Sequence, residues 1–219
     1  KSITEGNHVK IVQEYVSSPL LWGIHVGAKS SYKVLSDLEG TKVAISRFGS
    51  GSHLMAFVNA KKEGWNTNQL QFEVINNLDG AVEALTDGKA DYFMWEHFMT
   101  KPLVDKGIFK RLGDCPTPWP SFVVVATDNF LKENKKALRH ILEIINLYTG
   151  EFKTIPSIDR TLANRFDQQL EDIQEWLSIT HWSQTTLCIQ TIDLVQDTLL
   201  NLKLIEKKLS FDKIVESVQ

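Results

Sequence analysis

The residues with the clearest potential for chemistry lie in one stretch, Val43–Val58, which reads VAISRFGSGSHLMAFV. Its apolar start is typical of a buried strand, and Gly49 and Gly51 permit a sharp turn into a helix. Either Ser50 or Ser52 can cap that helix. The first N–H groups of a helix have no carbonyl partner within it, so they favour a bound anion. The stretch therefore indicates an anion-binding turn, with a plain serine-capped turn as the structural alternative.

Five residues of this turn are candidates for contact with a carboxylate, phosphate or sulfonate. The four at the start of the helix are Ser50, Gly51, Ser52 and His53. The fifth, Arg47, follows the strand and can bind a carboxylate or phosphate through two parallel hydrogen bonds, or can form a surface ion pair instead. No Gly-Lys-Ser/Thr follows, so the turn is not a P-loop, and no Gly-x-Ser-x-Gly marks a nucleophile elbow. Leu54 takes the place of the last glycine of a dinucleotide-binding motif.

Five further candidates for ligand binding lie where expected strands end or where the chain changes direction. Ser17 and Ser18 precede Pro19, and they can face a cleft or form a simple turn. Trp95 can stack on a flat or cationic ligand and Glu96 can accept a hydrogen bond from an amine, or both can belong to a helix start. The fifth of these candidates is Trp119. None of these positions forms a recognisable nucleophile–base pair, so we predict no catalytic residues.

The composition excludes several classes of protein. The chain has 219 residues, 42% of them hydrophobic and 23% charged, with a formal net charge of −3, which is ordinary for a globular protein. No basic block supports binding to nucleic acid, and no apolar run is long enough to span a membrane. The two cysteines, Cys115 and Cys188, give neither a disulfide framework nor metal-ligand spacing, and we expect both to be buried thiols. We predict no metal and no cofactor.

The order of elements predicts an α/β protein with two lobes. Expected strands over residues 9–16 and 20–27 precede three strand–helix repeats between residues 41 and 113, which imply a parallel sheet. Asp79 is expected to cap the second of these helices. A proline-rich segment, residues 115–120, then leads to an expected buried strand over residues 121–126. Helices are expected over 131–148, 158–166, 170–179 and 184–202, with a short one after Ser210.

These elements suggest three sections of chain. Residues 1–38 are predicted to form part of a first lobe, residues 39–116 the second α/β lobe, and residues 117–219 a crossing strand with helices that return to the first lobe. The passages between lobes are expected near residues 34–40 and 116–120. The chain starts with Lys1 inside an amphipathic segment, so we expect it to be a fragment of a longer protein, with the first lobe incomplete at its N-terminus.

The order of several short motifs resembles a known family. The motifs are YVSSP at 15–19, DLEGTKVAI at 37–45, GSGS at 49–52, ALTDGKAD at 84–91 and the pair Trp95-Glu96. Together they resemble the type 2 periplasmic binding protein fold, in the NMT1/THI5-like branch that includes alkanesulfonate- and taurine-binding proteins. The segments SRFGSGSH at 46–53 and CPTPW at 115–119 are similar to those of a subfamily found in Bacteroidetes and some fungi.

The resemblance implies a solute-binding protein. Such a protein captures a small anionic or polar metabolite between its lobes by hinge closure and delivers it to the permease of an ABC-type transporter. One alternative is a THI5-like enzyme acting on a thiamine-pyrimidine precursor, although this chain lacks that enzyme's cysteine cluster. Another is the ligand-sensing domain of a regulator. The first role implies a periplasmic or extracytoplasmic location, and a fungal-type member would be cytoplasmic.

Overall fold

The computed structural model describes residues 1–218, which form two compact units. Unit 1 contains Lys1–Pro19 and the chain from Pro118 onward, and unit 2 contains Leu20–Thr117. The chain passes from one unit to the other at residues 19–20 and again at residues 117–118. The sequence analysis placed the first passage near residues 34–40. Residues 20–38, which it gave to the first lobe, belong instead to unit 2.

The reason for this difference is the place of β2 (Leu21–Gly27) in the sheet of unit 2. That sheet has the strand order β4–β3–β5–β2–β6, and β2 is antiparallel to both of its neighbours. The other strands are β3 (Lys42–Ile45), β4 (Gln71–Val74), β5 (Tyr92–Glu96) and β6 (Phe109–Pro116). β3 is parallel to β4 and β5, as the strand–helix repeat predicts. The sheet is therefore mixed rather than all parallel, because β2 inserts between two strands that lie much later in the sequence.

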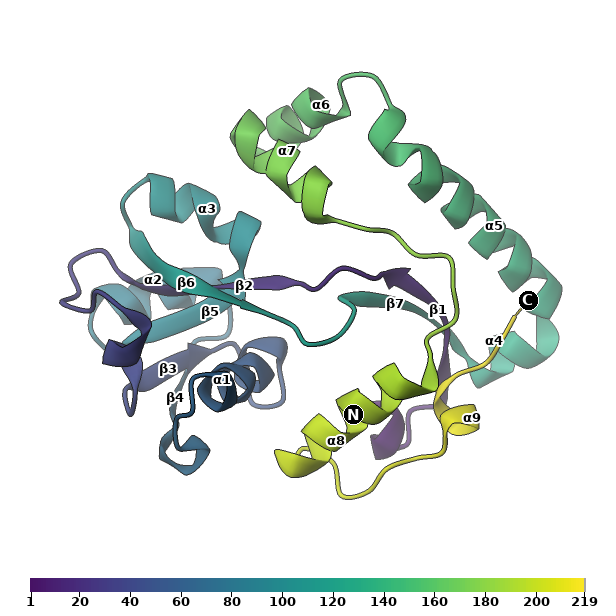
Figure 1. Ribbon diagram of the computed structural model, residues 1–219, viewed down its shortest axis with the longest axis horizontal. Coiled ribbons are helices and arrows are strands. Elements are labelled where there is room, and N and C mark those ends of the chain that lie inside the picture. The colour runs from purple at the N-terminus through teal and green to yellow at the C-terminus, as the bar shows by residue number, and fades with distance from the viewer. Residues whose placement is uncertain (219) are drawn as a thin grey trace. The chain divides into compact units, whose positions relative to one another are not determined.

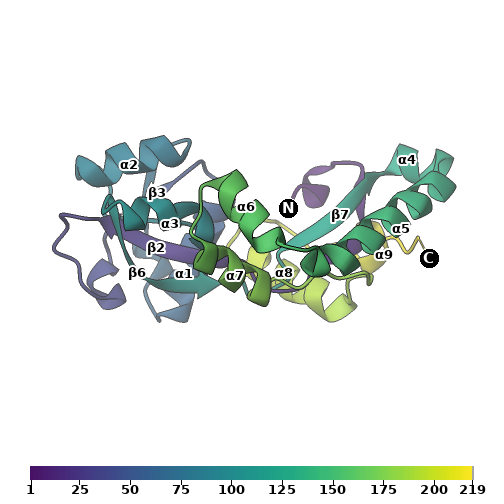
Figure 2. The ribbon, with the colours of Figure 1, turned by 90° about the horizontal axis from the view of Figure 1, so that it is seen from above.

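Helices cover both faces of this sheet (Figure 2). α1 (Gly51–Lys62) packs on one face, where Ile24, Val43 and Met55 are buried together. α2 (Leu78–Thr86) and α3 (His97–Asp105) cover the other face, where the core includes Phe93 and Phe109. The short 3-10 helices η2 (Leu35–Leu38) and η3 (Thr67–Gln69) complete the connections. This arrangement brings the start of α1 to the carboxyl ends of β3 and β5, where open α/β sheets bind ligands.

Unit 1 is mainly helical around a two-stranded antiparallel sheet, β1 (Val9–Val16) with β7 (Phe122–Thr127) (Figure 1). Ile11 and Val12 are neighbours in a strand, so they point to opposite faces. Val12 packs with Leu138 and Leu142, whereas Ile11 packs near Ile192 and Ile214. The helices are η1 (Ile3–Glu5), α4 (Asp128–Glu133), α5 (Lys135–Glu151), η4 (Phe152–Thr154), α6 (Ile158–Phe166), α7 (Leu170–Ile179), α8 (Ile189–Asn201) and α9 (Phe211–Ile214).

Local sequence signals located most of these elements. The bounds of β1, α6 and α7 agree residue for residue with the predicted ranges. Of the two serines predicted as possible caps of α1, Ser50 is the N-terminal cap, and the helix starts at Gly51. The helix expected over 184–202 starts only at Ile189, because residues 182–185 run beside β1 in extended form and hydrogen bond to it.

Three expectations about individual residues are wrong. The strand expected to be fully buried, β7, exposes most of its side chains, because helices pack on only one of its faces. The side chain that caps α2 is Asn77, whose amide oxygen accepts from the Gly80 N–H at 3.0 Å, and Asp79 lies in the first turn of the helix. Cys115 is buried as expected, but Cys188 is exposed at the start of α8. None of the helices within residues 1–218 has the length and apolar character needed to cross a membrane.

Two helical glycines allow a direct test of how tightly α2 packs. A Cβ atom on Gly80 would lie 2.1 Å from the carbonyl oxygen of Ile75, whereas one on Gly150 in α5 would meet only the end of the flexible Gln184 side chain at 3.7 Å. Replacing glycine by alanine within a helix normally stabilises it by up to about 1 kcal/mol. We expect Gly150→Ala to raise the free energy of unfolding by up to that amount. We expect Gly80→Ala to lower it by about 1–3 kcal/mol, because the backbone of Ile75 must move. Urea denaturation of both variants checks this, and a gain in stability for Gly80→Ala would contradict it.

Candidate functional site

The turn between β3 and α1 is held together by its own serine hydroxyls. The Oγ of Ser52 accepts a hydrogen bond from the Ser46 N–H at 3.0 Å and lies 3.0 Å from the Oγ of Ser50. Ser50 Oγ in turn accepts from the His53 N–H at 3.3 Å, which is the N-terminal cap of α1. All three serines are buried. The hydroxyls of Ser50 and Ser52 therefore shape the turn, and Ser50 is the serine that caps α1.

The His53 side chain faces an aromatic cluster. Its ring centroid lies 4.8 Å from that of Phe72, 5.1 Å from Phe57 and 5.3 Å from Phe48, each in an edge-on geometry. Its Nδ1 accepts a hydrogen bond from the Gly49 N–H at 3.2 Å, which requires an unprotonated nitrogen. Burial lowers the pKa of His53 below its usual value. The imidazole is therefore suited to stabilising the turn as a neutral ring, and it does not supply a positive charge for an anion.

Two features of the turn remain open to a ligand. Gly51 is exposed, and its N–H and that of Ser52 belong to the first turn of α1, where amides have no carbonyl partner within the helix. Arg47 is also exposed, and among residues 1–218 its side chain has no ion pair or hydrogen bond. A helix of 12 residues carries a partial positive charge at this end, and a guanidinium adds a full charge nearby. The chemistry available is that of anion binding.

Trp22, which the sequence analysis did not include among the candidates, lies against this turn. A Cβ atom on Gly51 would be 2.8 Å from Cη2 of Trp22, so only glycine permits this close approach. Trp22 also meets Trp95 edge to face, with ring centroids 6.4 Å apart, and Trp95 stacks on Phe93 at 5.3 Å. In the register of β2 with β5, Trp95 lies opposite Gly23, the residue that follows Trp22. Trp22 thus places an aromatic surface beside the turn.

Glu96 acts as the cap of α3. Its Oε2 accepts a hydrogen bond from the Met99 N–H at 2.7 Å, and burial raises the pKa of its carboxyl in opposition to that bond. The alternative given for Glu96 in the sequence analysis, a helix start, therefore describes its contacts. Trp95 remains available at the end of β5 as a half-buried aromatic surface.

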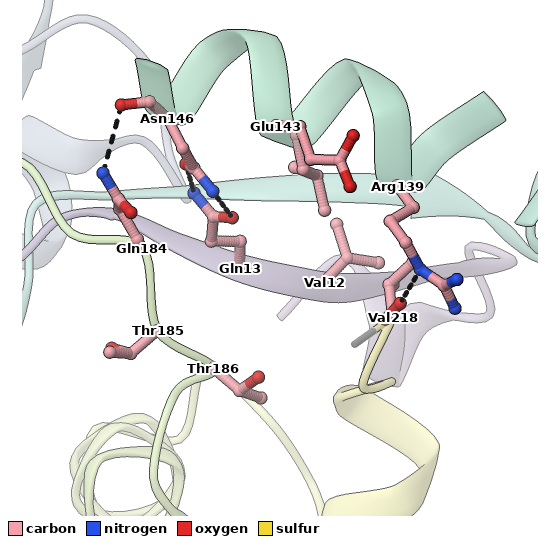
Figure 3. A pocket seen from close by; sticks show the side chains of 10 residues that line it. Val12, Gln13, Arg139, Glu143, Asn146, Gln184, Thr185, Thr186 and Val218 are labelled. Carbon is pink, nitrogen blue, oxygen red and sulfur yellow. Dashed lines mark hydrogen bonds between the residues drawn. The ribbon is translucent and has the colours of Figure 1, made fainter. Parts of the chain in front are cut away.

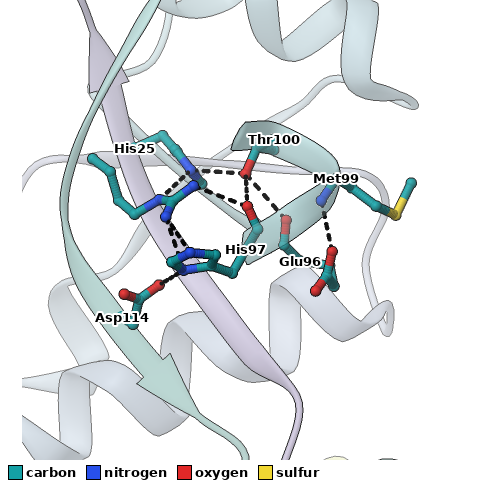
Figure 4. Close-up of polar contacts among 7 residues, drawn as sticks. His25, Glu96, His97, Met99, Thr100 and Asp114 are labelled. Atoms are coloured by element: carbon teal, nitrogen blue, oxygen red, sulfur yellow. Dashed lines mark hydrogen bonds and ion pairs between the residues drawn. The ribbon is translucent and has the colours of Figure 1, made fainter. Parts of the chain in front are cut away.

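A polar network that sequence reasoning missed lies on the α3 side of the sheet (Figure 4). His25 is fully buried, and its Nε2 lies 2.9 Å from the Thr100 hydroxyl and 3.4 Å from Nε of Arg111. Arg111 also donates to the carbonyl oxygen of His97 at 2.9 Å. Nδ1 of His97 lies 2.7 Å from Oδ1 of Asp114. The network ties β2, β6 and the start of α3 together.

The same contacts argue against His97 as a general base. A neutral ring that donates from Nδ1 to Asp114 leaves Nε2 as its acceptor, and Nη1 of Arg111 already donates to that nitrogen. A base must instead present a free lone pair to the proton that it removes. The arrangement therefore works as a structural bridge between a guanidinium and a carboxylate. No sequence pattern indicates this network, because its five residues lie on three separate elements.

Three of the predicted site residues belong to unit 1. The Ser17 hydroxyl donates to the carbonyl oxygen of His181 at 3.1 Å, and Ser18 Oγ accepts from the His181 N–H at 3.1 Å. Ser121 also donates to the carbonyl oxygen of Ser18. These bonds fix the end of β1 to two other segments of unit 1. Trp119 is half buried. The ligand-binding role of Ser17, Ser18 and Trp119 stays a prediction.

Unit 1 also contains a cavity of about 400 Å³ between β1, α5 and residues 184–186 (Figure 3). Its polar lining is largely engaged, because the side-chain amides of Gln13 and Asn146 bond to each other at 2.7 and 3.1 Å. Arg139 donates from Nε to the carbonyl oxygen of Val218 at 3.1 Å. A second cavity, of about 550 Å³, lies in unit 2 beside Tyr32 and Asp91. Neither is lined by any of the ten predicted ligand-binding residues.

Within the described part of the chain, no group of three or more His, Cys, Asp or Glu side chains could hold a metal ion. The prediction of ligand binding depends on the turn between β3 and α1 and on the aromatic side chains beside it.

Residues 22–115 match a family model described as Ca3427-like periplasmic binding proteins. Among solved structures, the chain is similar to the Candida albicans CA3427 gene product, described as having the generic periplasmic binding protein fold. That pair has a TM-score of 0.85 and 24% sequence identity, and the match covers 99% of this chain and 75% of the other. No curated protein sequence matches the chain.

Two sulfonate-binding proteins are also similar in structure. The alkanesulfonate-binding protein SsuA of Xanthomonas axonopodis pv. citri, bound to MOPS, has a TM-score of 0.81 at 16% identity, covering 99% of this chain and 76% of its own. The aliphatic sulphonate binding protein SsuA of Escherichia coli has a TM-score of 0.67 at 18% identity, covering 99% and 71%.

This chain has the type 2 periplasmic binding protein fold. The fold class that the motif order implied is thus confirmed. Within this fold, unit 2 carries seven of the predicted site residues, and it brings Gly51 and Trp95 together with Trp22. The sequence contained a signal for Trp22, since a tryptophan at the start of a strand presents an aromatic surface at one end of the sheet. Its neighbour across space, Gly51, could not be identified without the fold.

The buried His25 of this periplasmic-binding-protein fold predicts a loss of stability in acid. Burial and the nearby Arg111 charge lower the pKa of His25 from 6.5 to about 4, with smaller effects from Asp114 and His97. The neutral form is thus favoured in the folded state, so its stabilisation is complete above pH 6.5 and is lost as the pH falls towards 4. Over this pH range the free energy of unfolding falls by about 3 kcal/mol in total.

His25→Gln keeps an acceptor for Thr100 but cannot titrate, so we expect it to remove this part of the acid dependence. His8→Gln is the matched control, since the His8 side chain is 90% exposed. Urea denaturation between pH 4.5 and 7.5 measures the slope for each variant. If His25→Gln and the unchanged protein lose stability in parallel, burial of His25 is not the cause.

Proposed function

We propose that this chain is a solute-binding protein whose ligand is a small organic anion, with sulfonates as the class that fits best. The observation that carries the proposal is the exposed start of α1, where Arg47 and the Gly51 amide lie free of other partners. Trp22 and Trp95 beside it supply an apolar surface for the organic part of such a ligand. Two neighbours in structure are sulfonate-binding proteins, which supports this class.

The physical argument favours an anion with a spread charge. A sulfonate has three equivalent oxygens, so it can accept from the backbone amides at the helix start and from a guanidinium at the same time. The serine hydroxyls are occupied within the turn, so recognition depends on N–H donors rather than on hydroxyls. This donor set also binds carboxylates and phosphates, and the aromatic wall favours those that carry an apolar group.

Several finer predictions accompany this proposal. An ABC transporter permease as partner and hinge closure around the ligand are both consistent with a solute-binding role. The contacts of His97 with Asp114 and Arg111 favour this role over catalysis by His97, because both of its ring nitrogens are engaged. The THI5-like enzyme and the ligand-sensing domain of a regulator remain the alternatives.

The test is calorimetric titration with taurine, ethanesulfonate, octanesulfonate, octanoate and inorganic sulfate. We expect an alkanesulfonate to bind, and Arg47→Ala to weaken it by about tenfold to a hundredfold, the cost of losing a charge-assisted hydrogen bond. Arg47→Lys should retain part of the affinity, since it keeps the charge but loses the planar fork. Arg160→Ala, at an exposed position on α6, is the control and should bind normally. Equal affinity for Arg47→Ala and the control, or no binding by any of these anions, would count against the proposal.

A further inference from the structure

The connection between β4 and α2 contains one residue in an unusual backbone conformation, Asn76. Its φ is 64°, in the left-handed region that residues with a Cβ atom seldom adopt. The Asn77 N–H donates to the Ile75 carbonyl oxygen at 2.7 Å, so these three residues form a γ-turn centred on Asn76. A γ-turn whose central residue has a positive φ is the rare and strained form of this turn.

Contacts on both sides of Asn76 hold the backbone in this conformation. The Ile75 N–H donates to the Ile45 carbonyl oxygen at 2.9 Å. The Asn76 N–H donates to the Ser46 carbonyl oxygen at 3.1 Å. On the helix side, a Cβ atom on Gly80 would lie 2.1 Å from the Ile75 carbonyl oxygen, so α2 begins in close contact with the γ-turn. Backbone strain persists only where the surroundings enforce it, and it is concentrated at functional sites.

The end of a helix does not explain the conformation of Asn76. Within residues 1–218, the non-glycine residues with a positive φ are Asn76, Ser157, Asp167 and Lys203. Asp167 ends α6 and Lys203 lies just beyond α8, where a left-handed residue is usual. Ser157 immediately precedes α6. Asn76 instead follows a strand, and the side chain that caps the next helix belongs to Asn77.

The γ-turn lies beside the turn between β3 and α1. β3 and β4 are parallel neighbours, so the chain leaves both strands at the same edge of the sheet. The hydrogen bond from the Asn76 N–H joins the γ-turn to Ser46, and the Ser46 N–H bonds to Ser52 Oγ in the first turn of α1 at 3.0 Å. Arg47 is the residue after Ser46. Asn76 is therefore a neighbour of the donors proposed above for the anion.

The side-chain amide of Asn76 takes no part in holding its own turn. The residue is exposed, and its side chain forms no hydrogen bond within the described part of the chain. The amide of Asn77 differs in this respect, because its oxygen accepts from the Gly80 N–H. Glycine would adopt the same positive φ without strain, whereas asparagine also brings an amide to this position. That amide is free to bind a ligand.

We propose that Asn76 is a specificity-determining residue that selects sulfonates over carboxylates, an inference that rests on the function proposed above. A carboxylate has two oxygens, and the amides at the start of α1 together with the Arg47 guanidinium can donate to both of them. A sulfonate has a third oxygen, and the Nδ2 group of Asn76 donates to it. Without that donor the third oxygen loses a hydrogen bond that it makes in water, so the affinity for a sulfonate falls.

Calorimetric titration with octanesulfonate and octanoate tests this role. Asn76→Gly removes the amide and keeps a residue suited to the positive φ. We expect it to weaken octanesulfonate at least about tenfold, the cost of one hydrogen bond to a charged group, and octanoate by about twofold or less. Asn76→Asp should weaken both anions, because its carboxylate repels them. Ser157→Gly is the matched control at another exposed, uncharged position with a positive φ, and it should bind both anions normally.

A purely structural role for Asn76 predicts a different result. Both glycine variants should keep a Tm within about 3 °C of the unchanged protein, so that weaker binding by Asn76→Gly does not reflect unfolding. Normal binding of octanesulfonate by Asn76→Gly or Asn76→Asp would overturn the inference, as would an equal loss of affinity for octanesulfonate and octanoate in Asn76→Gly. If binding still depends on Arg47 in these cases, the proposed function stands and the role of Asn76 alone is wrong. Failure of the unchanged protein to bind any anion overturns both.

Discussion

The hydrogen bonding of β2 between β5 and β6 is the constraint on which the rest of unit 2 depends. β2 enters the sheet antiparallel to both neighbours, and its alternating side chains then serve both layers. Ile24 and Val26 join the core under α1, while His25 points into the layer of α2 and α3. The same register sets Trp22 opposite Glu96 and against the start of α1. A shift by one residue would exchange these faces, so both the surroundings of the turn between β3 and α1 and the buried polar network depend on this pairing.

The two clusters of polar residues in unit 2 have different roles. Around Ser46, Ser50 and Ser52, hydroxyls satisfy backbone and side-chain groups inside a sharp turn, so that the backbone amides at the helix start remain for a ligand. Around His25 and Arg111, charge-assisted bonds hold the start of α3 to β6 and β2. Buried polar groups are costly unless they are paired, and the pairing here engages Arg111, Asp114 and both ring nitrogens of His97. The first cluster thus shapes a turn with exposed backbone amides, and the second holds structural elements together.

Unit 1 differs from unit 2 in how much of its core the sheet and the helices supply. Its sheet has two strands, and helices supply most of the buried surface on either side of them. The side chains of Ser17 and Ser18 belong to this structural framework, because both bond to the backbone of His181, while Ser121 donates to the Ser18 carbonyl oxygen. Their position at the end of β1 agrees with the sequence, but their partners come from segments more than 100 residues away. A motif that resembles a binding sequence can thus also have a structural role that depends on residues far away in the sequence.

The sequence by itself determined the local elements of this protein. Periodicity and capping residues located β1, α6 and α7 and the turn around Gly49–Ser52, because these signals act over a few residues. The order of motifs was enough to imply the fold. Only the tertiary structure decided which sheet contains β2, which partners surround His25 and His53, and that Trp22 lies against Gly51. Strand alternation specifies the two faces of a strand but not its neighbours, and those neighbours are set by hydrogen bonds between residues far apart in the chain.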